Sequence, residues 1–199
     1  MYRAVENRVA VVLSEFRLPI SEECALEILC QGGFRQVRVD VCEIARARVS
    51  VVQYRRGARM CEAPQVMDCS SMMKWVYGQM GICIPRRSIQ QRALGRRVSL
   101  DEVQVGDLVF VSGWQDWYDD NPGDGVGHVG IVVGDNQVIH AANRKVGVIT
   151  TPLDRFTDGC FRGAARFVED WNKLFVFECP ARWEVETSDD LKWIVLWQL

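Results

Sequence analysis

The chain has 199 residues, with 24 Lys and Arg against 26 Asp and Glu and a formal net charge of −2. This length is enough for one domain with a buried core, or for one domain with an appendage. The near balance of charge gives no reason to expect a nucleic-acid partner. Arginines gather within residues 55–59 and 86–97, which we interpret either as solvated faces or as a rim that attracts an anionic ligand.

Near the N-terminus only residues 9–13 form an apolar run, which is too short for a signal-peptide core or a membrane span. The sequence as written therefore predicts a cytoplasmic location, although a protein exported by another route, or trimmed of its signal, would look the same. The eight cysteines show no CxxC pair and no tight metal-ligand spacing. We expect most of them to be reduced and buried, and we expect no metal site.

Residues 1–39 are expected to form an N-terminal extension of one strand and one helix. Residues 9–16 have strand composition. In "PISEECALEILCQGG", Ser21 is placed as the N-cap of a helix that the two glycines end. A second helix is expected to begin at Asp40, which together with Glu43 has the spacing of a capping box.

The stretch "MDCSSMMKW" reads as the start of a third helix, with Asp68 as a possible N-cap and Cys69 in the first turn. Unpaired backbone N–H groups and the positive end of the helix dipole would stabilise a thiolate there and lower the pKa of Cys69. The ordinary alternative is a small buried hydrophobic residue, which is the usual fate of a free cysteine.

From residue 103 the chain changes to short strands, "VQVGDLVFV", "HVGIVVGDNQVIHAA", "KVGVITTP" and "GAARFV". The Gly-Asp-Asn turn in the second segment is a strong hairpin signal. A helix followed by antiparallel strands predicts an α+β fold in which the helix packs on one face of the sheet.

Residues 169–199 contain two further apolar segments, "LFVFECP" and "WIVLWQL". We expect a strand-rich C-terminal extension, a hairpin that completes the sheet of the same domain. The alternative is that this Trp-rich segment contacts a partner or a second copy of the chain.

The chain has two histidines, His128 and His140, and both fall in the predicted hairpin. A nucleophilic thiol needs a base, and a base works best when another group holds its second ring nitrogen. The two histidines could supply both to Cys69 if the turn register places them on one face. The alternative is two half-buried histidines with backbone partners.

Three segments in order, "DCSSMMKWVYGQMGICIPRRSIQQ", "VQVGDLVFV" and "GHVGIVVGDNQVIHAA", resemble the NlpC/P60 cysteine peptidases of bacterial cell-wall metabolism. The resemblance covers residues 40–168 and implies a papain-like catalytic domain. It implies Cys69 as the nucleophile, His128 as general base and acid, and His140 as the residue that orients His128. It also implies no metal and no cofactor.

The resemblance further implies a pocket for the free amino end of the substrate, lined by Tyr54, Asp68 and Ser70. The implied function is a cysteine endopeptidase or amidase that cuts the γ-D-glutamyl–diamino acid bond of peptidoglycan stem peptides. The alternatives are a thiol acyltransferase or amidase with a substrate outside the cell wall, and a phage-tail or effector assembly module on the same scaffold.

The sequence departs from the family pattern in three places. Ser71 stands where a glycine or a similarly small residue is usual, and "RRGARMCEAP" replaces an aromatic-glycine segment. A long loop, residues 112–127, contains Trp114, Trp117 and Tyr118. We expect this loop beside the active site as a lid or specificity wall, with a solvated excursion as the alternative.

Overall fold

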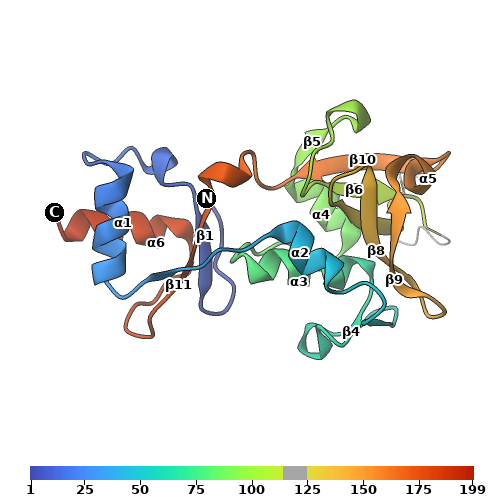
Figure 1. The fold of residues 1–199 in the computed structure, drawn as a ribbon, viewed down its shortest axis with the longest axis horizontal. Coiled ribbons are helices and arrows are strands. Elements are labelled where there is room, and N and C mark those ends of the chain that lie inside the picture. Colours follow the sequence, from blue (N-terminus) through green and yellow to red (C-terminus); the bar gives the residue numbers. More distant parts are fainter. Residues whose placement is uncertain (114–124) are drawn as a thin grey trace. The chain divides into compact units, whose positions relative to one another are not determined.

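The computed structural model describes residues 1–113 and 125–199 (Figure 1). Trp114, Trp117 and Tyr118, which we expected in a lid, lie outside the described residues. The chain divides into two compact units. The first contains Met1–Val39, Tyr77–Cys83 and Asp170–Leu199, and the second contains Asp40–Val76 and Ile84–Glu169. Within the described ranges, no helix combines the length and the apolar character needed to cross a bilayer.

The first unit is built on a three-stranded antiparallel sheet with the order β1-β11-β2. Its strands are β1 (Arg8–Val11), β2 (Arg35–Gln36) and β11 (Phe175–Glu178). Its helices are the 3-10 helices η1 (Leu13–Phe16) and η5 (Trp171–Lys173) and the α-helices α1 (Glu22–Gln31) and α6 (Ser188–Trp197). Helices α1 and α6 contact each other and cross in Figure 1. The Ser21 hydroxyl accepts a hydrogen bond from the Cys24 N–H at 3.3 Å, which confirms the predicted helix start.

The C-terminal segment corrects one prediction. Residues 193–199, expected to be a strand, belong mostly to helix α6, and β11 pairs with β1 and β2 instead of completing the sheet of the second unit. The helix begins where the Asp190 carboxylate accepts a hydrogen bond from the Thr187 N–H at 2.8 Å. Leu191, Ile194 and Val195 then recur at helical spacing and are buried in the core of this unit. A short apolar run is compatible with a strand or with a helix, and the capping bond between Thr187 and Asp190 favours the helix here.

The second unit contains a six-stranded antiparallel sheet with the order β5-β10-β6-β7-β8-β9. The strands are β5 (Arg96–Val98), β6 (Leu108–Val111), β7 (His128–Val132), β8 (Gln137–Asn143), β9 (Gly147–Pro152) and β10 (Phe161–Arg166). A separate parallel pair joins β3 (Gln53–Tyr54) to β4 (Val66–Met67). This arrangement confirms the predicted α+β class and the β7–β8 hairpin.

Four α-helices accompany this sheet, namely α2 (Val41–Arg46), α3 (Cys69–Gln79, whose last residues belong to the first unit), α4 (Ser88–Leu94) and α5 (Leu153–Thr157). Among the described residues of this unit there are also two 3-10 helices, η2 (Met60–Glu62) and η3 (Leu100–Glu102). The Asp40 carboxylate caps α2 by accepting from the backbone N–H of Cys42 at 2.7 Å and of Glu43 at 3.1 Å. The second helix therefore starts where the sequence predicts.

A buried ion pair holds the start of β6 to β10. Asp107, in the Gly-Asp turn before β6, accepts two hydrogen bonds from the Arg166 guanidinium, at 2.9 and 2.7 Å. Asp107 also accepts from the N–H of Gln104 at 2.8 Å, and Arg166 donates to the carbonyl of Glu102 at 2.8 Å. The aspartate of "VQVGDLVFV" thus has a structural use, which is to join the turn to the neighbouring strand.

Candidate active site

The start of helix α3 presents Cys69, as the sequence predicts. Asp68 Oδ1 accepts a hydrogen bond from the Ser71 N–H at 2.8 Å, and the Ser71 hydroxyl accepts from the Asp68 N–H at 2.8 Å. These reciprocal bonds close the first turn of the helix, so the serine that departs from the family pattern contributes to the cap. Cys69 lies in this turn and is half-buried, so part of its surface stays accessible.

The two histidines lie on the same face of the sheet. Val132 of β7 pairs with Val138 of β8, and side chains two residues apart along a strand share a face. His128 Nε2 lies 2.8 Å from His140 Nδ1, which is hydrogen-bonding distance. Gly130 makes room for this contact, because a Cβ there would lie 2.3 Å from Val138 Cγ1 and 3.2 Å from His140 Cβ.

Two further residues contact the histidine pair, and our reading of the sequence missed both. His140 Nε2 lies 2.9 Å from Thr151 Oγ1, on strand β9. The ring of Phe156, on α5, lies with its centroid 4.8 Å from that of His140 and 5.7 Å from that of His128. Thr151 could have been found from strand alternation in "KVGVITTP" once the β8–β9 register was known, whereas Phe156 left no local signal.

Burial keeps the candidate nucleophile protonated. It raises the pKa of Cys69 to about 11, the negative charge of Asp68 adds to the rise, and hydrogen bonding from the backbone at Val129 and Ser70 opposes it. The expectation of a lowered pKa at the helix start was therefore wrong for this state of the protein, because desolvation outweighs the helix terminus. The hydrogen bond from Val129 also places the thiol beside β7, next to His128.

Burial acts on the histidines in the opposite direction. It lowers the pKa of His128 to about 4, although the charge of Asp68 raises it slightly. It also lowers the pKa of His140 to about 3, with the neighbouring His128 acting in the same direction. At neutral pH the resting groups are therefore a thiol and two uncharged imidazoles, with no formal charge among them.

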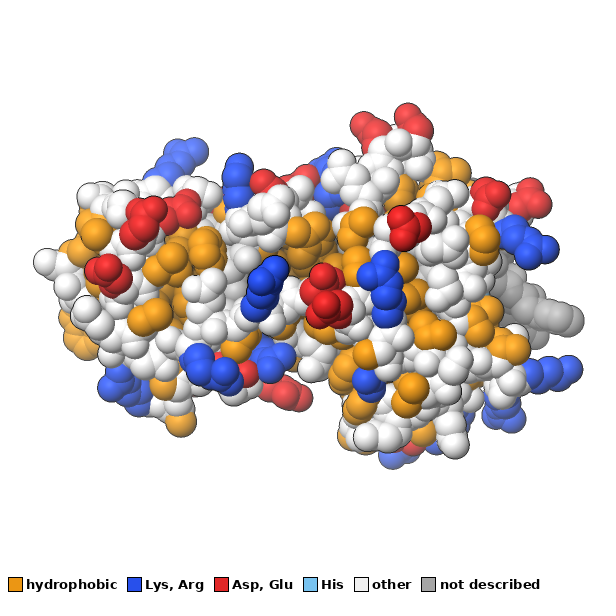
Figure 2. Space-filling view, viewed as in Figure 1, with side chains coloured by type: hydrophobic (Ala, Val, Ile, Leu, Met, Phe, Trp, Pro, Cys, Tyr) orange, Lys and Arg blue, Asp and Glu red, His pale blue; other side chains and the backbone are white. Residues whose placement is uncertain are grey.

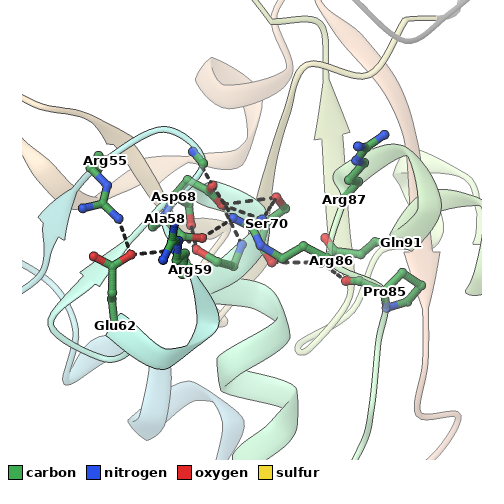
Figure 3. Close-up of polar contacts among 12 residues, drawn as sticks. Arg55, Ala58, Arg59, Glu62, Asp68, Ser70, Pro85, Arg86, Arg87 and Gln91 are labelled. Carbon is green, nitrogen blue, oxygen red and sulfur yellow. Dashed lines mark hydrogen bonds and ion pairs between the residues drawn. The ribbon is translucent and has the colours of Figure 1, made fainter.

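Asp68 is the centre of a polar network (Figure 3). The Arg86 guanidinium donates to both carboxylate oxygens, from Nη1 to Oδ1 at 3.0 Å and from Nη2 to Oδ2 at 2.6 Å. Oδ2 also accepts from the Gly57 N–H at 2.9 Å. Burial acts to raise the pKa of Asp68, but the bonds from Arg86 and Ser71 together hold it below its ordinary value. Asp68 is therefore an anion at neutral pH, paired with an arginine.

The same network reaches Ser70. Arg86 Nη1 donates to Ser70 Oγ at 2.9 Å, and Gln91 Nε2 donates to the Ser70 carbonyl at 2.9 Å and to the Pro85 carbonyl at 2.8 Å. Arg86 and Gln91 thereby attach the segment "PRRSIQQ" to the start of α3 (Figure 3). Neither residue was among the predicted site residues, although both lie in a segment that carries the family resemblance.

Tyr54 lies beside the same helix start. Strands β3 and β4 are parallel, with Tyr54 opposite Met67, the residue before Asp68. Burial raises the pKa of the Tyr54 phenol, and negative charge at Cys69 and at Asp68 raises it further. The phenol is thus within electrostatic range of both groups. The structure brings Tyr54, Asp68 and Ser70 together around the first turn that carries Cys69.

Several arginines of the predicted rim have partners within the chain. Arg55 pairs with Glu62, Arg92 donates to the Arg162 carbonyl at 2.7 Å, and Arg96 pairs with Glu169 at 2.6 Å. On the face drawn in Figure 2, Lys and Arg side chains are interspersed with Asp and Glu. The segment "RRGARMCEAP" is also anchored to the site, because the Ala58 carbonyl accepts from Arg86 Nη2 at 2.6 Å.

A comparison with known families identifies the chain. The sequence model of the NlpC/P60 family matches residues 52–158, just over half of the chain. The chain belongs to the NlpC/P60 family. The match covers the start of α3, the histidine hairpin and Thr151, so every residue of the candidate site described above lies within the family region.

Curated relatives in this family are named as endopeptidases. A probable endopeptidase of Corynebacterium glutamicum is 37% identical over 105 residues, which are 52% of this chain and 43% of that protein. The probable endopeptidase p60 of Listeria seeligeri is 41% identical over 83 residues, 42% of this chain and 14% of that protein. The chain therefore spans less than half the length of these NlpC/P60 relatives.

Solved NlpC/P60 structures share the fold. The NlpC/p60 domain of the peptidoglycan hydrolase SagA is 26% identical, with a TM-score of 0.51, over 64% of this chain and 96% of that domain. NlpC2 from Trichomonas vaginalis is 21% identical, with a TM-score of 0.54, over 65% of this chain and 49% of that chain. These similarities confirm the papain-like α+β fold.

Proposed function

We propose that this NlpC/P60 protein is a cysteine endopeptidase or amidase of peptidoglycan stem peptides, with Cys69, His128 and His140 as its catalytic groups. The observation that carries the proposal is the 2.8 Å contact between the two imidazoles beside a half-buried thiol at a helix start. The relatives named as endopeptidases, and the SagA domain described as part of a peptidoglycan hydrolase, support the reaction class. The bond proposed is the one between γ-D-glutamate and the diamino acid.

The histidine contact determines which nitrogen does the chemistry. His128 Nε2 is occupied by His140, so Nδ1 is the nitrogen left to take the Cys69 proton. For Nδ1 to carry a lone pair in the neutral ring, Nε2 must carry the hydrogen and donate it to His140 Nδ1. His140 then holds His128 in the tautomer that a general base requires.

The reaction follows in two balanced steps. Cys69 Sγ attacks the scissile carbonyl carbon as its proton moves to His128 Nδ1, and the backbone N–H of Cys69 is the proposed donor to the oxyanion. The C–N bond then breaks, and His128 gives the proton to the leaving amine, which produces a thioester. Water attacks the thioester while His128 takes one of its protons, and the C–S bond then breaks as that proton returns to Cys69. The product leaves as a carboxylic acid, which loses its remaining proton to solvent.

Tyr54, Asp68 and Ser70 are proposed to bind the free amino end of the substrate. Both oxygens of Asp68 already accept hydrogen bonds from Arg86 and from backbone N–H groups. We therefore expect Asp68 to attract an ammonium through its charge, while the Tyr54 phenol offers a direct acceptor.

The test is incubation of the full chain with defined muropeptides, with and without prior alkylation by iodoacetamide, followed by mass spectrometry. We expect hydrolysis at the γ-D-glutamyl bond, and its loss on alkylation and in Cys69→Ala. Cys83→Ala is the matched control, because Cys83 is also a half-buried thiol but lies outside the site. If no muropeptide is cleaved by a protein whose Cys69 alkylates, the cell-wall assignment fails, and an acyltransferase or amidase with another substrate becomes the better reading.

A further inference from the structure

Thr151 stands at the end of a hydrogen-bonded chain that starts at the candidate base. The chain runs from His128 Nε2 to His140 Nδ1 over 2.8 Å, and from His140 Nε2 to Thr151 Oγ1 over 2.9 Å. Both ring nitrogens of His140 are therefore engaged. His140 is 7% exposed, so a ring nitrogen without a partner there would lose most of its contact with water.

The sheet register explains why Thr151 reaches His140. In the β8–β9 pair, Ile149 lies opposite His140, and Thr151 lies opposite Val138. Thr151 and His140 are thus diagonal neighbours on one face, a separation that a long side chain such as imidazole can bridge. The preceding residue, Thr150, points to the other face and is exposed. The two adjacent threonines therefore have different surroundings.

The direction of this chain of bonds matters for catalysis. If Thr151 accepts from His140 Nε2–H, then His140 Nδ1 is free to accept from His128 Nε2–H, and His128 Nδ1 has a lone pair for the Cys69 proton. If the chain ran the other way, His140 Nδ1 would donate to His128 Nε2. His128 would then carry its hydrogen on Nδ1 and could not act as the base.

We propose that Thr151 is a positioning residue that fixes the tautomers of His140 and His128, so that His128 Nδ1 faces the nucleophile as a base. The inference rests on the proposed roles of Cys69 and His128. Thr151 would then be the fourth residue of the proposed site, after Cys69, His128 and His140. The hydroxyl is half-buried, so its own hydrogen can turn towards solvent or the backbone while the oxygen accepts.

The direct test is the tautomer state of the imidazoles. The chain has two histidines, so labelling with ¹⁵N-histidine gives two ring systems, which His140→Asn assigns. At neutral pH we expect long-range ¹H–¹⁵N spectra to show both rings with the hydrogen on Nε2. Thr151→Val removes the acceptor at nearly constant volume, and we expect the hydrogen to move to Nδ1 in both rings. Thr151→Ser should keep the original pattern, and Thr150→Val is the matched control.

The kinetic test uses the same variants on the muropeptide that the full chain cleaves. We expect Thr151→Val to lower kcat by about tenfold to a hundredfold with little change in KM, because a buried donor loses its partner. Thr151→Ser and Thr150→Val should stay within about threefold of the unaltered chain. A role in packing alone would not produce rescue by serine together with a change of tautomer.

The outcomes separate this inference from the proposed function. A hydrogen on Nδ1 of either imidazole in the unaltered chain would overturn the inference, and this measurement needs neither an assignment nor a variant that folds. Unchanged tautomers and unchanged kcat in Thr151→Val would overturn it as well. If the unaltered chain cleaves no muropeptide, the proposed substrate fails, but the tautomer spectra still decide the role of Thr151.

Discussion

Replacing Arg86 by methionine tests the polar network that surrounds the start of helix α3. Arg86 donates to Asp68 through two nitrogens, to Ser70 Oγ and to the Ala58 carbonyl. Asp68 is 6% exposed, so the substitution leaves a buried carboxylate with only N–H and hydroxyl donors. Breaking a buried ion pair costs about 3–5 kcal/mol. Because the Arg86 side chain is 32% exposed, we reduce this to about 2–3 kcal/mol for the free energy of unfolding at pH 7.

The free energy of unfolding lost in Arg86→Met should be largest at neutral pH and smaller at acidic pH. In the unaltered chain the pKa of Asp68 is held below its ordinary value, so its stabilising effect is present above that value and is lost as the pH falls through the lowered pKa. Without Arg86, burial dominates and the pKa of Asp68 rises. The difference in unfolding free energy between Arg86→Met and the unaltered chain should therefore narrow as the pH falls from 7 to 4, because the variant carboxyl takes up its proton above the ordinary carboxyl pKa of about 3.9.

Urea unfolding at pH 7 and pH 4 measures both effects. Alkylation of Cys42, which is buried in the second unit, reports the opening of that unit by mass spectrometry. Arg87→Met, an exposed arginine at the next position, is the matched control and should change the midpoint little. Equal midpoints for Arg86→Met and the unaltered chain at pH 7 would refute the reasoning, as would a difference that stays constant between the two pH values.

Three further predictions concern packing, ionisation and the sheet. Gly130→Ala places a methyl group 2.3 Å from Val138 Cγ1 and 3.2 Å from His140 Cβ. We expect thermal unfolding to show a loss of about 1–3 kcal/mol in the free energy of unfolding, and we expect the proposed muropeptide hydrolysis to fall. Unchanged stability would contradict this contact. Burial raises the pKa of Cys69 to about 11, so its alkylation by iodoacetamide in the free protein should rise about tenfold per pH unit between pH 8 and 10, and a plateau below pH 8 would show a stable thiolate. Arg166→Met leaves Asp107, 2% exposed, without its partner, and should cost about 3–5 kcal/mol in urea unfolding, whereas the double substitution with Asp107→Asn should recover part of that loss.

Local signals predicted the helix starts well. Ser21, Asp40 and Asp68 each accept a backbone N–H at the start of the helix that follows, because capping depends on residues within one turn. The β7–β8 hairpin also follows from local chemistry, since Asp135 and Asn136 both adopt the positive φ that its turn requires. These features need no knowledge of distant contacts.

Features set by distant contacts were not predictable in the same way. The shared face of His128 and His140 depends on the strand register, and the pairing of Arg86 with Asp68 joins residues 18 positions apart. The direction in which the pKa of Cys69 shifts depends on the burial of the thiol in the folded chain, and the sequence at the helix start does not reveal that burial. The strand prediction for residues 193–199 was wrong for another reason. The short apolar run fits either a strand or a helix, and the helix-start signal at Thr187 was not weighed against it.

The neutral resting state of the site has a consequence for chemical durability. Oxidants attack thiolates far faster than thiols, and sulfinic and sulfonic acids of cysteine are not restored by ordinary thiols. Burial raises the pKa of Cys69 from 9.0 to about 11, so at pH 7 it holds roughly 100-fold less thiolate than a cysteine at the unshifted value. If Cys69 acts as the proposed nucleophile and loses its proton only as it attacks, its resting thiol would therefore react slowly with peroxide. The burial that lowers the reactivity of the resting thiol would in this way also slow its irreversible oxidation.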